Sequence, residues 1–158
     1  MVTKTPQYGN YRPVSMKASR MGKSNKKSGT NPERLLIRTL KELGIRIYSS
    51  KRHVQGNPDL VFWKKRIVIF CDGDFWHGRN WHERRKKLEV GANASYWVKK
   101  IEYNRIRDRK NNLLLKNLGW KVIRVWESTI LNHPKNVSRR IKKILDEKED
   151  KLKELNKN

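Results

Sequence analysis

Apolar residues recur at the spacing of amphipathic helices in three parts of the chain. The first begins at residues 30–33, where a hydroxyl cap, an early proline and a glutamate three residues after the threonine predict a helix start. Gly44 predicts the end of this helix, and Gly119 follows a second helix expected from about residue 95 to residue 118. The apolar positions of the three expected helices are Leu36, Leu40 and Leu43, then Trp97, Ile101, Leu114, Leu115 and Leu118, and finally Val137, Ile141, Ile144 and Leu145.

Shorter apolar runs rich in β-branched residues lie between and after the first two helices, and they predict strands. The expected strands are residues 45–48, 59–63, 67–71 and 120–126. A loop rich in tryptophan and arginine is expected after the third strand, through Arg85. The resulting order, α-β-β-β-α-β-α, predicts an α/β fold with a mixed central sheet.

The composition adds a strong excess of positive charge. Lys and Arg number 39 and Asp and Glu 15 in 158 residues, which gives a formal net charge of +24. Surfaces of thermophilic proteins balance lysine with glutamate and this chain does not, so the excess predicts a nucleic acid as partner. An anionic membrane surface is the alternative, but the sequence contains no long apolar run. The single cysteine, Cys71, suits a reducing compartment, so we expect a cytoplasmic, nucleoid-associated protein without a membrane partner.

The charge is distributed unevenly along the chain. Residues 1–29 contain seven cations and no acid, which predicts a basic flexible arm in which Lys26 and Lys27 contact nucleic acid. A plain disordered tail with incidental charge is the alternative for this segment. We expect residues 30–130 to form the folded core and residues 131–158 a C-terminal helix with a charged tail.

Candidate chemistry gathers around the two central strands. Asp59 begins one strand, Asp72 ends its partner, and His77 follows in the next loop. Acids at the tips of adjacent strands can share a divalent cation, and a nearby imidazole can transfer a proton. Asp59 is the most informative of these residues, because a carboxylate at the start of a buried strand normally has a cation or a metal as partner. In so basic a protein, the expected substrate of such a site is a phosphodiester.

Two further acids lie on the predicted helices, and each has an ordinary structural alternative. Glu33 can hold a second metal or can simply complete the helix cap. Asp108 can join the site or can simply pair with an arginine of its own helix. Phosphodiester cleavage requires a hard cation with oxygen ligands, and Asp59 with a backbone carbonyl near Cys71 can supply such ligands.

Aromatic residues follow the central strands in an unusual setting. Phe75, Trp76 and Trp81 lie in a loop beside Arg79, where no core for them is evident in the sequence. Exposed aromatic side chains among cations can stack on bases or wedge between base pairs, so we expect Phe75, Trp76 and Arg79 to contact the nucleic acid. Packing over the sheet edge is the alternative, whereas the tryptophans at both ends of the last predicted strand fit core positions.

Several motifs, in chain order, resemble the very short patch repair (Vsr) endonucleases. The resemblance runs from about residue 16 to residue 127, and its motifs are specific. It implies a restriction-endonuclease-like αβββαβ core, here with a C-terminal helix. It also implies Mg²⁺ as cofactor, with Mn²⁺ as its expected substitute, and a nick in double-stranded DNA on the 5′ side of a thymine mispaired with guanine. The motifs are NPE at 31–33, GNPD at 56–59, IFCDGDFWHG at 69–78, YWVKKI at 96–101, NRIRD at 104–108 and LGWKVIRVWE at 118–127.

The resemblance also assigns roles to individual residues. Asp59 falls on the central metal ligand, with the Cys71 carbonyl beside it and Glu33 as a further ligand. Phe75, Trp76 and Trp97 fall on the aromatic residues that family members insert next to the mismatch. The family positions for catalysis are occupied here by Glu33, Asp59, His77 and Asp108.

This chain departs from the family pattern at two places. Asp72 stands where the family commonly has a second active-site histidine. The family's structural zinc is held by cysteine and histidine, and the matching positions here are Asp74, Arg79, Trp81 and Ser128. We therefore expect no structural zinc, and we expect packing by Trp81 and Trp126 to hold residues 74–83.

We predict a magnesium-dependent endonuclease that acts in DNA repair, as a monomer that works with other repair proteins. One alternative is a Vsr-like restriction or homing endonuclease that cuts paired DNA. The other is a non-catalytic DNA-binding module, which the clustered acids disfavour because carboxylates repel phosphate.

Overall fold

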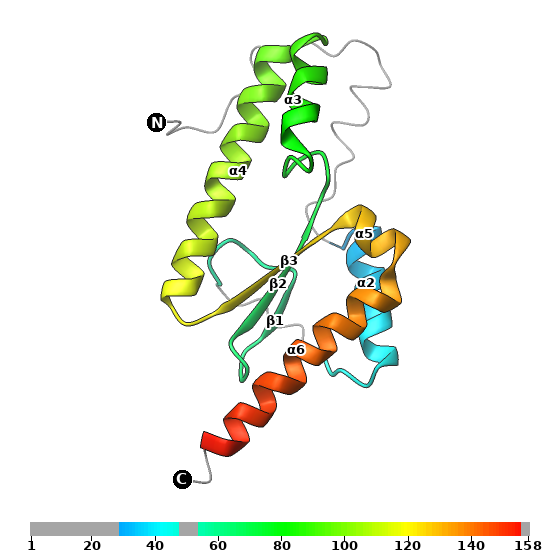
Figure 1. Cartoon of the computed structure of the whole chain (residues 1–158), viewed down its shortest axis with the longest axis vertical. Coiled ribbons are helices and arrows are strands. Elements are labelled where there is room, and N and C mark those ends of the chain that lie inside the picture. Colours follow the sequence, from blue (N-terminus) through cyan, green and yellow to red (C-terminus); the bar gives the residue numbers. More distant parts are fainter. Residues whose placement is uncertain (1–28, 48–53, 156–158) are drawn as a thin grey trace.

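The computed structural model describes residues 29–47 and 54–155 and contains one sheet with helices on both faces (Figure 1). Lys26, Lys27 and the rest of the expected basic arm up to residue 28 lie outside the described residues. The elements in chain order are α2 (Asn31–Glu42), β1 (Leu60–Phe62), β2 (Ile67–Asp72), α3 (Trp81–Glu89), α4 (Ala94–Asn117), β3 (Lys121–Trp126), α5 (Glu127–Asn132) and α6 (Pro134–Leu155).

The sheet is mixed, as predicted, and has the order β1-β2-β3. Strands β1 and β2 are antiparallel, with Leu60 opposite Ile69. Strands β2 and β3 are parallel, so that the chain crosses between them through α3 and α4. The parallel register places Asp72 opposite Trp126 at the ends of the two strands.

Each face of central strand β2 belongs to a different apolar cluster, because successive side chains of a strand point to opposite faces. Ile67 and Ile69 pack in one cluster with residues of α2, α5 and α6. Val68 and Phe70 pack in the other with Leu115 of α4. Figure 1 shows the same arrangement, with α4 on one side of the sheet and α2, α5 and α6 on the other.

The strand predicted at residues 45–48 is wrong over the part that the structure describes. Residues 45–47 contain no strand and instead complete the C-terminus of α2. Ile45 N donates to Leu40 O at 3.1 Å and Gly44 N donates to Lys41 O at 2.9 Å, with Gly44 at φ +78°. This is the Schellman arrangement, which satisfies carbonyls that the helix end leaves unpaired. Ile45 and Ile47 then pack against the first apolar cluster.

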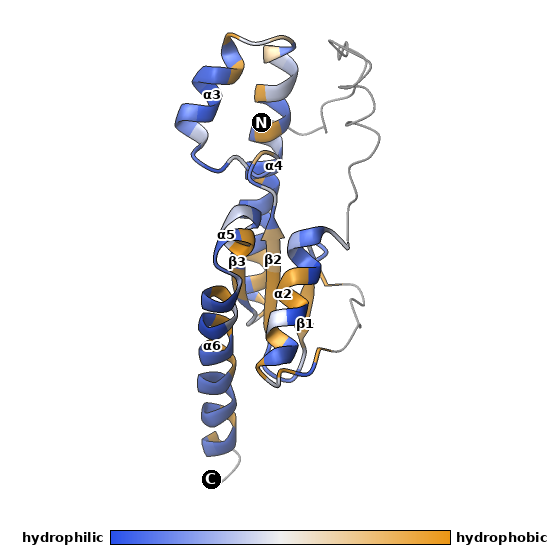
Figure 2. Ribbon diagram, turned by 90° about the vertical axis from the view of Figure 1, so that its right-hand side faces the viewer, coloured by the Kyte–Doolittle hydropathy of each residue, from blue (hydrophilic) through white to orange (hydrophobic). Residues whose placement is uncertain are grey.

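Helix α3 begins inside the loop that was predicted through Arg85, and helix α5 was not predicted. None of the nine residues of α3 is buried, so the helix lacks the apolar stripe that would have revealed it. Figure 1 shows α3 and the first half of α4 projecting beyond the sheet, and Figure 2 shows that α3 is mostly hydrophilic while the strands are hydrophobic. In the part of the chain that the structure describes, no helix combines the length and apolar character needed to span a membrane.

Candidate active site

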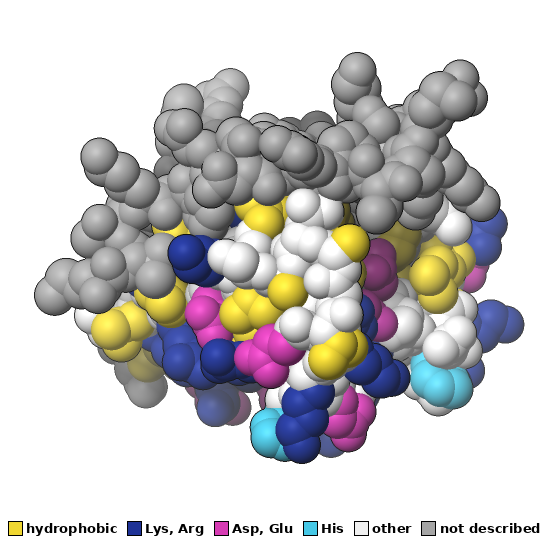
Figure 3. Space-filling model, turned by 90° about the horizontal axis from the view of Figure 1, so that it is seen from above, with side chains coloured by type: hydrophobic (Ala, Val, Ile, Leu, Met, Phe, Trp, Pro, Cys, Tyr) yellow, Lys and Arg dark blue, Asp and Glu magenta, His cyan; other side chains and the backbone are white. Residues whose placement is uncertain are grey.

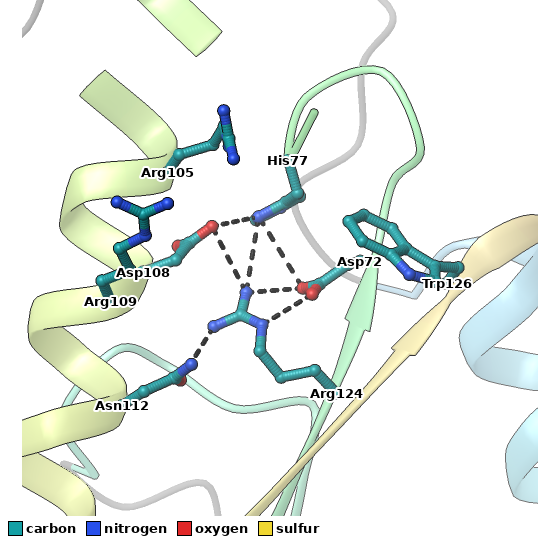
Figure 4. Close-up of a pocket in the computed structure, with 8 residues that line it drawn as sticks. All are labelled: Asp72, His77, Arg105, Asp108, Arg109, Asn112, Arg124 and Trp126. Carbon is teal, nitrogen blue, oxygen red and sulfur yellow. Dashed lines mark hydrogen bonds and ion pairs between the residues drawn. The ribbon is translucent and has the colours of Figure 1, made fainter. Parts of the chain in front are cut away.

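A cavity of about 200 Å³ opens where β2 and β3 end beside α4. Side chains from both strands, from the loop after β2 and from one face of α4 converge on it (Figure 4). Its lining residues are Asp72, His77, Arg105, Asp108, Arg109, Asn112, Arg124 and Trp126. The structure therefore brings together three of the predicted catalytic residues, Asp72, His77 and Asp108.

A buried ion pair joins Asp72 of β2 to Arg124 of β3. Arg124 Nε donates to Asp72 Oδ2 and Arg124 Nη2 donates to Asp72 Oδ1, both at 2.6 Å, and Asp72 is only 4% exposed. Such two-fold pairing fixes the orientation of both planar groups. Burial alone would lower the pKa of Arg124, but the hydrogen bonds and negative charge of Asp72, together with the charges of Asp108 and Asp59, raise it above its ordinary value. The guanidinium is therefore a permanent cation in the site.

The imidazole of His77 contacts Asp108 on α4. His77 Nδ1 lies 2.5 Å from Asp108 Oδ2 and 3.7 Å from Asp72 Oδ1. Because an ionised carboxylate only accepts hydrogen bonds, the short contact with Asp108 assigns the ring proton to Nδ1, and in the neutral ring Nε2 then has the lone pair. Arg124 Nη2 lies farther from the same Nδ1, at 3.4 Å. Burial would raise the pKa of the Asp108 carboxyl, but the hydrogen bond from His77 and the charges of His77, Arg124 and Arg107 lower it below its ordinary value.

Asp59 lies beside the backbone of Cys71, whose carbonyl was predicted to share a metal with it, and the contact in the structure is with the Cys71 N–H. Cys71 N donates to Asp59 Oδ2 at 2.6 Å, and the charge of Asp59 reaches Arg124. Within residues 29–47 and 54–155, no three side chains of His, Cys, Asp or Glu are grouped so as to hold a metal ion by themselves. Mg²⁺ retains several waters and needs only one or two protein carboxylates, so the Asp59 carboxylate beside the Cys71 backbone is chemically suited to this ion.

Glu33 occupies the helix cap that was its structural alternative. Its Oε2 accepts from Gly29 N at 2.8 Å and its Oε1 accepts from Thr30 Oγ1 at 3.0 Å, while Glu33 N donates back to Thr30 Oγ1 at 3.5 Å. The side chain is buried, with 6% exposure, and it does not line the cavity that contains His77. The reciprocal bonds are those of a capping box.

Polar contacts hold the loop after β2, where packing alone was expected. Arg79 Nη1 donates to Ser128 Oγ, and it lies 3.5 Å from Asp74 Oδ1. Asp74 N in turn donates to Glu127 Oε1 at 2.8 Å. Asp74, Arg79 and Ser128, three of the four positions that the resemblance matches to zinc ligands, thus contact one another directly. Of the expected packing residues, Trp126 does contact this loop, because the Arg79 guanidinium lies 5.9 Å from its ring centre.

The fourth position, Trp81, faces α4 instead. The guanidinium of Arg105 lies 5.4 Å from the centre of its ring. Trp120 and Trp126 are half-buried rather than fully buried core residues, and Trp126 lines the cavity. Arg79, predicted to bind DNA, is engaged inside the loop.

The aromatic residues predicted to wedge into DNA form one cluster. The ring centres of Phe75 lie 5.1 Å from Trp76 and 5.2 Å from Trp97, and those of Trp76 and Trp97 are 5.7 Å apart. All three residues are half-buried rather than freely exposed. Asn104 fixes the cluster to α4 by donating from Nδ2 to the carbonyl of Trp76 at 2.9 Å.

Helix α3 and the first half of α4 form a projection beyond the sheet, and the surface around this projection suits a polyanion. Cations lie over the aromatic rings, including Arg84 at 5.6 Å from the ring centre of Phe75. Seen from above the projection, the described surface shows Lys and Arg side chains interspersed with hydrophobic and acidic ones (Figure 3). Aromatic rings beside cations are the combination that binds bases and phosphates together.

Sequence reasoning missed Arg124, although a signal for it exists. It is the one cation within the apolar run Val122-Ile123-Arg124-Val125 of a strand. A cation at such a position requires a buried carboxylate, which the structure identifies as Asp72. Asn112, which accepts from Arg124 Nη1 at 3.1 Å, gave no such signal.

Comparisons with known proteins identify the family of the chain. The family described as "DNA mismatch endonuclease Vsr" matches residues 13–83. The chain is 41% identical over 128 residues to type II nicking enzyme V.HpaIIP of Haemophilus parainfluenzae, covering 81% of this chain and 89% of that one. It is 34% identical to type II nicking enzyme V.NmeDIP of Neisseria meningitidis serogroup C, over 80% of this chain and 84% of that one. It is 32% identical to DNA mismatch endonuclease Vsr of Escherichia coli K12, over 73% and 72% respectively. The chain therefore belongs to the family of Vsr DNA mismatch endonucleases.

Proposed function

We propose that this protein is a magnesium-dependent endonuclease that nicks one strand of duplex DNA at a T:G-type mismatch. The observation that carries the proposal is the convergence of Asp72, His77 and Asp108 in one cavity at the strand ends, beside the contact between Asp59 and Cys71. The names of the relatives, which include nicking enzymes and a mismatch endonuclease, support the same reaction class.

His77 is the proposed general base. The hydrogen bond from Nδ1 to Asp108 orients the ring and leaves the Nε2 lone pair to accept a proton from water. Asp108 remains ionised, because its pKa is lowered, and so stabilises the imidazolium that forms when the water loses its proton. Attack of that water on phosphorus breaks one P–O bond of the backbone and produces a nick.

Asp59 and the Cys71 carbonyl are the proposed Mg²⁺ ligands. When bound there, the ion would withdraw charge from the scissile phosphate and stabilise the negative charge that builds on it. Glu33, whose oxygens already accept from Gly29 and Thr30, would contribute only through water. Both proposed direct ligands are oxygen donors, which suits a hard cation.

The aromatic cluster is the proposed mismatch sensor. Inserting Phe75 and Trp76 into a duplex must break stacking, which costs a few kcal/mol and less where pairing is already weak. Phe75 and Trp76 lie on the same loop after β2 that carries His77, so insertion would bring the adjacent DNA backbone to the cavity. Arg105 and Arg109, which line the cavity, would then meet phosphates.

The decisive experiment uses matched and T:G-mismatched duplexes with each strand labelled separately. In Mg²⁺ we expect one nick, in the strand that carries the mispaired thymine, and no cleavage in excess chelator. Asp59→Ala should abolish cleavage and leave DNA binding intact or tighter, because a metal ligand and a phosphate-repelling charge are removed together. Equal cleavage of the matched duplex, or an Asp59→Ala variant as fast as wild type, would contradict the proposal.

A further inference from the structure

Arg124 is a cavity-lining group to which the reaction proposed above gives no task. Its aliphatic stem comes from β3, where Arg124 is opposite Phe70 of β2. The guanidinium carbon lies 4.6 Å from the centre of the Phe70 ring. A planar cation stacked on an aromatic face is held in one plane, and here the plane directs the nitrogens toward the end of the sheet.

The guanidinium contacts β2, α4 and the loop after β2, where its Nη2 lies 3.4 Å from His77 Nδ1. Nε and Nη2 pair with Asp72 at the end of β2, and Nη1 donates to Asn112 Oδ1 on α4 at 3.1 Å. Nη2 also lies 3.4 Å from Asp108 Oδ2, one helical turn before Asn112. Figure 4 shows Arg124 between the strand and the helix, facing His77.

This position places one cation between two carboxylates that both approach His77. Without it, Asp72 and Asp108 would repel each other across the imidazole, because an oxygen of each carboxylate approaches the same Nδ1, at 3.7 Å and 2.5 Å. Asp72 would also be left as a buried, unpaired anion. The guanidinium offsets both charges and leaves Asp108 Oδ2 to accept the bond from His77 Nδ1.

We propose that Arg124 is a positioning residue, which joins β2 to α4 and thereby holds His77 and Asp108 in the geometry of general-base catalysis. The inference rests on the proposed function only for the role of His77 as base. Arg124 itself is not assigned a contact with DNA. It acts through Asp72 and Asp108, whose carboxylates its planar fork separates and orients.

The first test compares Arg124→Gln and Arg124→Lys with wild type in single-turnover nicking and in DNA binding. We expect Arg124→Gln to slow nicking about 10²-fold, the effect of misplacing a catalytic group by about 1 Å, with less than about threefold change in the dissociation constant. Arg124→Lys should restore little of the nicking rate, because an ammonium group cannot reproduce the planar, two-pronged donor geometry of the guanidinium. Lys121→Gln on the same strand is the matched control for charge. A wild-type rate in Arg124→Lys would overturn the proposal in favour of charge alone.

The second test asks whether Arg124 acts through Asp72. The double variant Asp72→Asn with Arg124→Gln removes both members of the buried pair and so leaves neither charge unpaired. We expect it to unfold at a higher temperature than Arg124→Gln alone and to nick no more slowly. If Asp72→Asn and Arg124→Gln instead slow nicking by factors that multiply in the double variant, the two residues act independently and the proposal is overturned. Because neither charge is left unpaired in the double variant, this variant can be compared with wild type if Arg124→Gln does not fold.

The third test needs no DNA cleavage. The ring proton of His77 on Nδ1 should give a slowly exchanging NMR signal, identified by its absence from His77→Gln. Arg124→Gln or the double variant should lose that signal while Lys121→Gln keeps it. An intact signal with a wild-type nicking rate would overturn the positioning role and leave the proposed function standing. Signals as expected, in a protein that nicks no duplex, would overturn the proposed function and leave the arrangement around Arg124 standing.

Discussion

Two regions of this molecule are stabilised in different ways, the sheet with its flanking helices and the projection made by α3 and the first half of α4. In the sheet, Ile67, Val68 and Ile69 of β2 have no exposed surface. In the projection, no residue of α3 is buried. The sheet is held by apolar burial on both faces. The projection has a smaller share of apolar burial, with Tyr96 and Ile101 of α4 buried, and aromatic rings with arginines over them and a few hydrogen bonds contribute the rest.

The residues that line the candidate active site lie where these two regions meet. Asp72 and Arg124 belong to the sheet, whereas Asp108 belongs to α4 and His77 to the loop that leads into α3. Gly78 allows that loop to approach α4, because a Cβ there would lie 2.9 Å from Arg105 Cδ and 3.0 Å from Ile101 Cγ2. Folding stability and catalytic geometry therefore depend on different contacts, and substitutions should separate them.

The largest effect is expected from truncating the sheet. Ile69→Ala removes fully buried methyl groups from β2 and should lower the free energy of unfolding by about 2–5 kcal/mol. Urea unfolding measures the change. The matched control is Val90→Ala beside α3, where the side chain is 89% exposed and the change should stay within about 0.5 kcal/mol. Equal losses at the two sites would erase the distinction between the regions.

The next effect is expected where the loop meets α4. Gly78→Ala should slow nicking about 10²-fold, because relief of the clash with Ile101 and Arg105 must shift the neighbouring His77. Gly44→Ala is the control, since both glycines have positive φ but a Cβ at Gly44 would meet nothing within 4 Å. Both variants should lose about 1 kcal/mol of stability from the backbone conformation. A nicking rate equally unaffected in both would show that the approach of the loop does not set the geometry of His77.

A smaller effect is expected within the projection. Replacing Phe75 and Trp76 together by Ala should remove most of the preference for mismatched over matched duplex, because the wedge is lost. Binding to matched duplex, measured by fluorescence anisotropy, should change little because it rests on lysine and arginine. Retained preference together with a large drop in unfolding temperature would place the pair in the core, and would favour cleavage of paired DNA.

The smallest effect is expected in the pH dependence of stability. The pKa of Asp108 is lowered in the folded protein, so its ionised form is stabilised there and adds stability above its ordinary value of 3.8. That contribution is lost as pH falls through the lower folded pKa. Asp108→Asn should therefore be less stable than wild type near neutral pH, and the difference should shrink below about pH 4. A difference that is constant from about pH 3 to about pH 7 would mean that the charge of Asp108 contributes nothing.

Local patterns in the sequence were sufficient to predict the first helix start and much of the sheet. The cap at Thr30 and Glu33, the paired strands after Asp59 and the contact of Asp59 with Cys71 follow from neighbouring residues. Helix α3 was missed because an element held by rings and cations has no apolar period. Residues 45–47 do not form the predicted strand, because the N–H of Ile45 donates to the carbonyl of Leu40 at the end of α2.

The contacts that build the site were harder to predict, because they join distant parts of the chain. Asp72 and Arg124 are separated by 52 positions, and Arg79 and Ser128 by 49. Neither pair follows from any spacing in the sequence. The motifs nevertheless contain Asp72, His77 and Asp108, which the structure brings to one cavity, whereas Glu33 lies in the helix cap.

The parallel pairing of β2 with β3 has a consequence for how the protein acquires activity. Parallel strands joined through a long crossover pair slowly, because the entropy of closing the loop must be overcome before the contacts form. Asp72 can meet Arg124 only after α3, α4 and β3 have all left the ribosome. Early folding intermediates, even with α2, β1 and β2 in place, therefore lack a complete catalytic centre. We expect a nascent chain of this nuclease to be harmless to DNA until its last strand has docked.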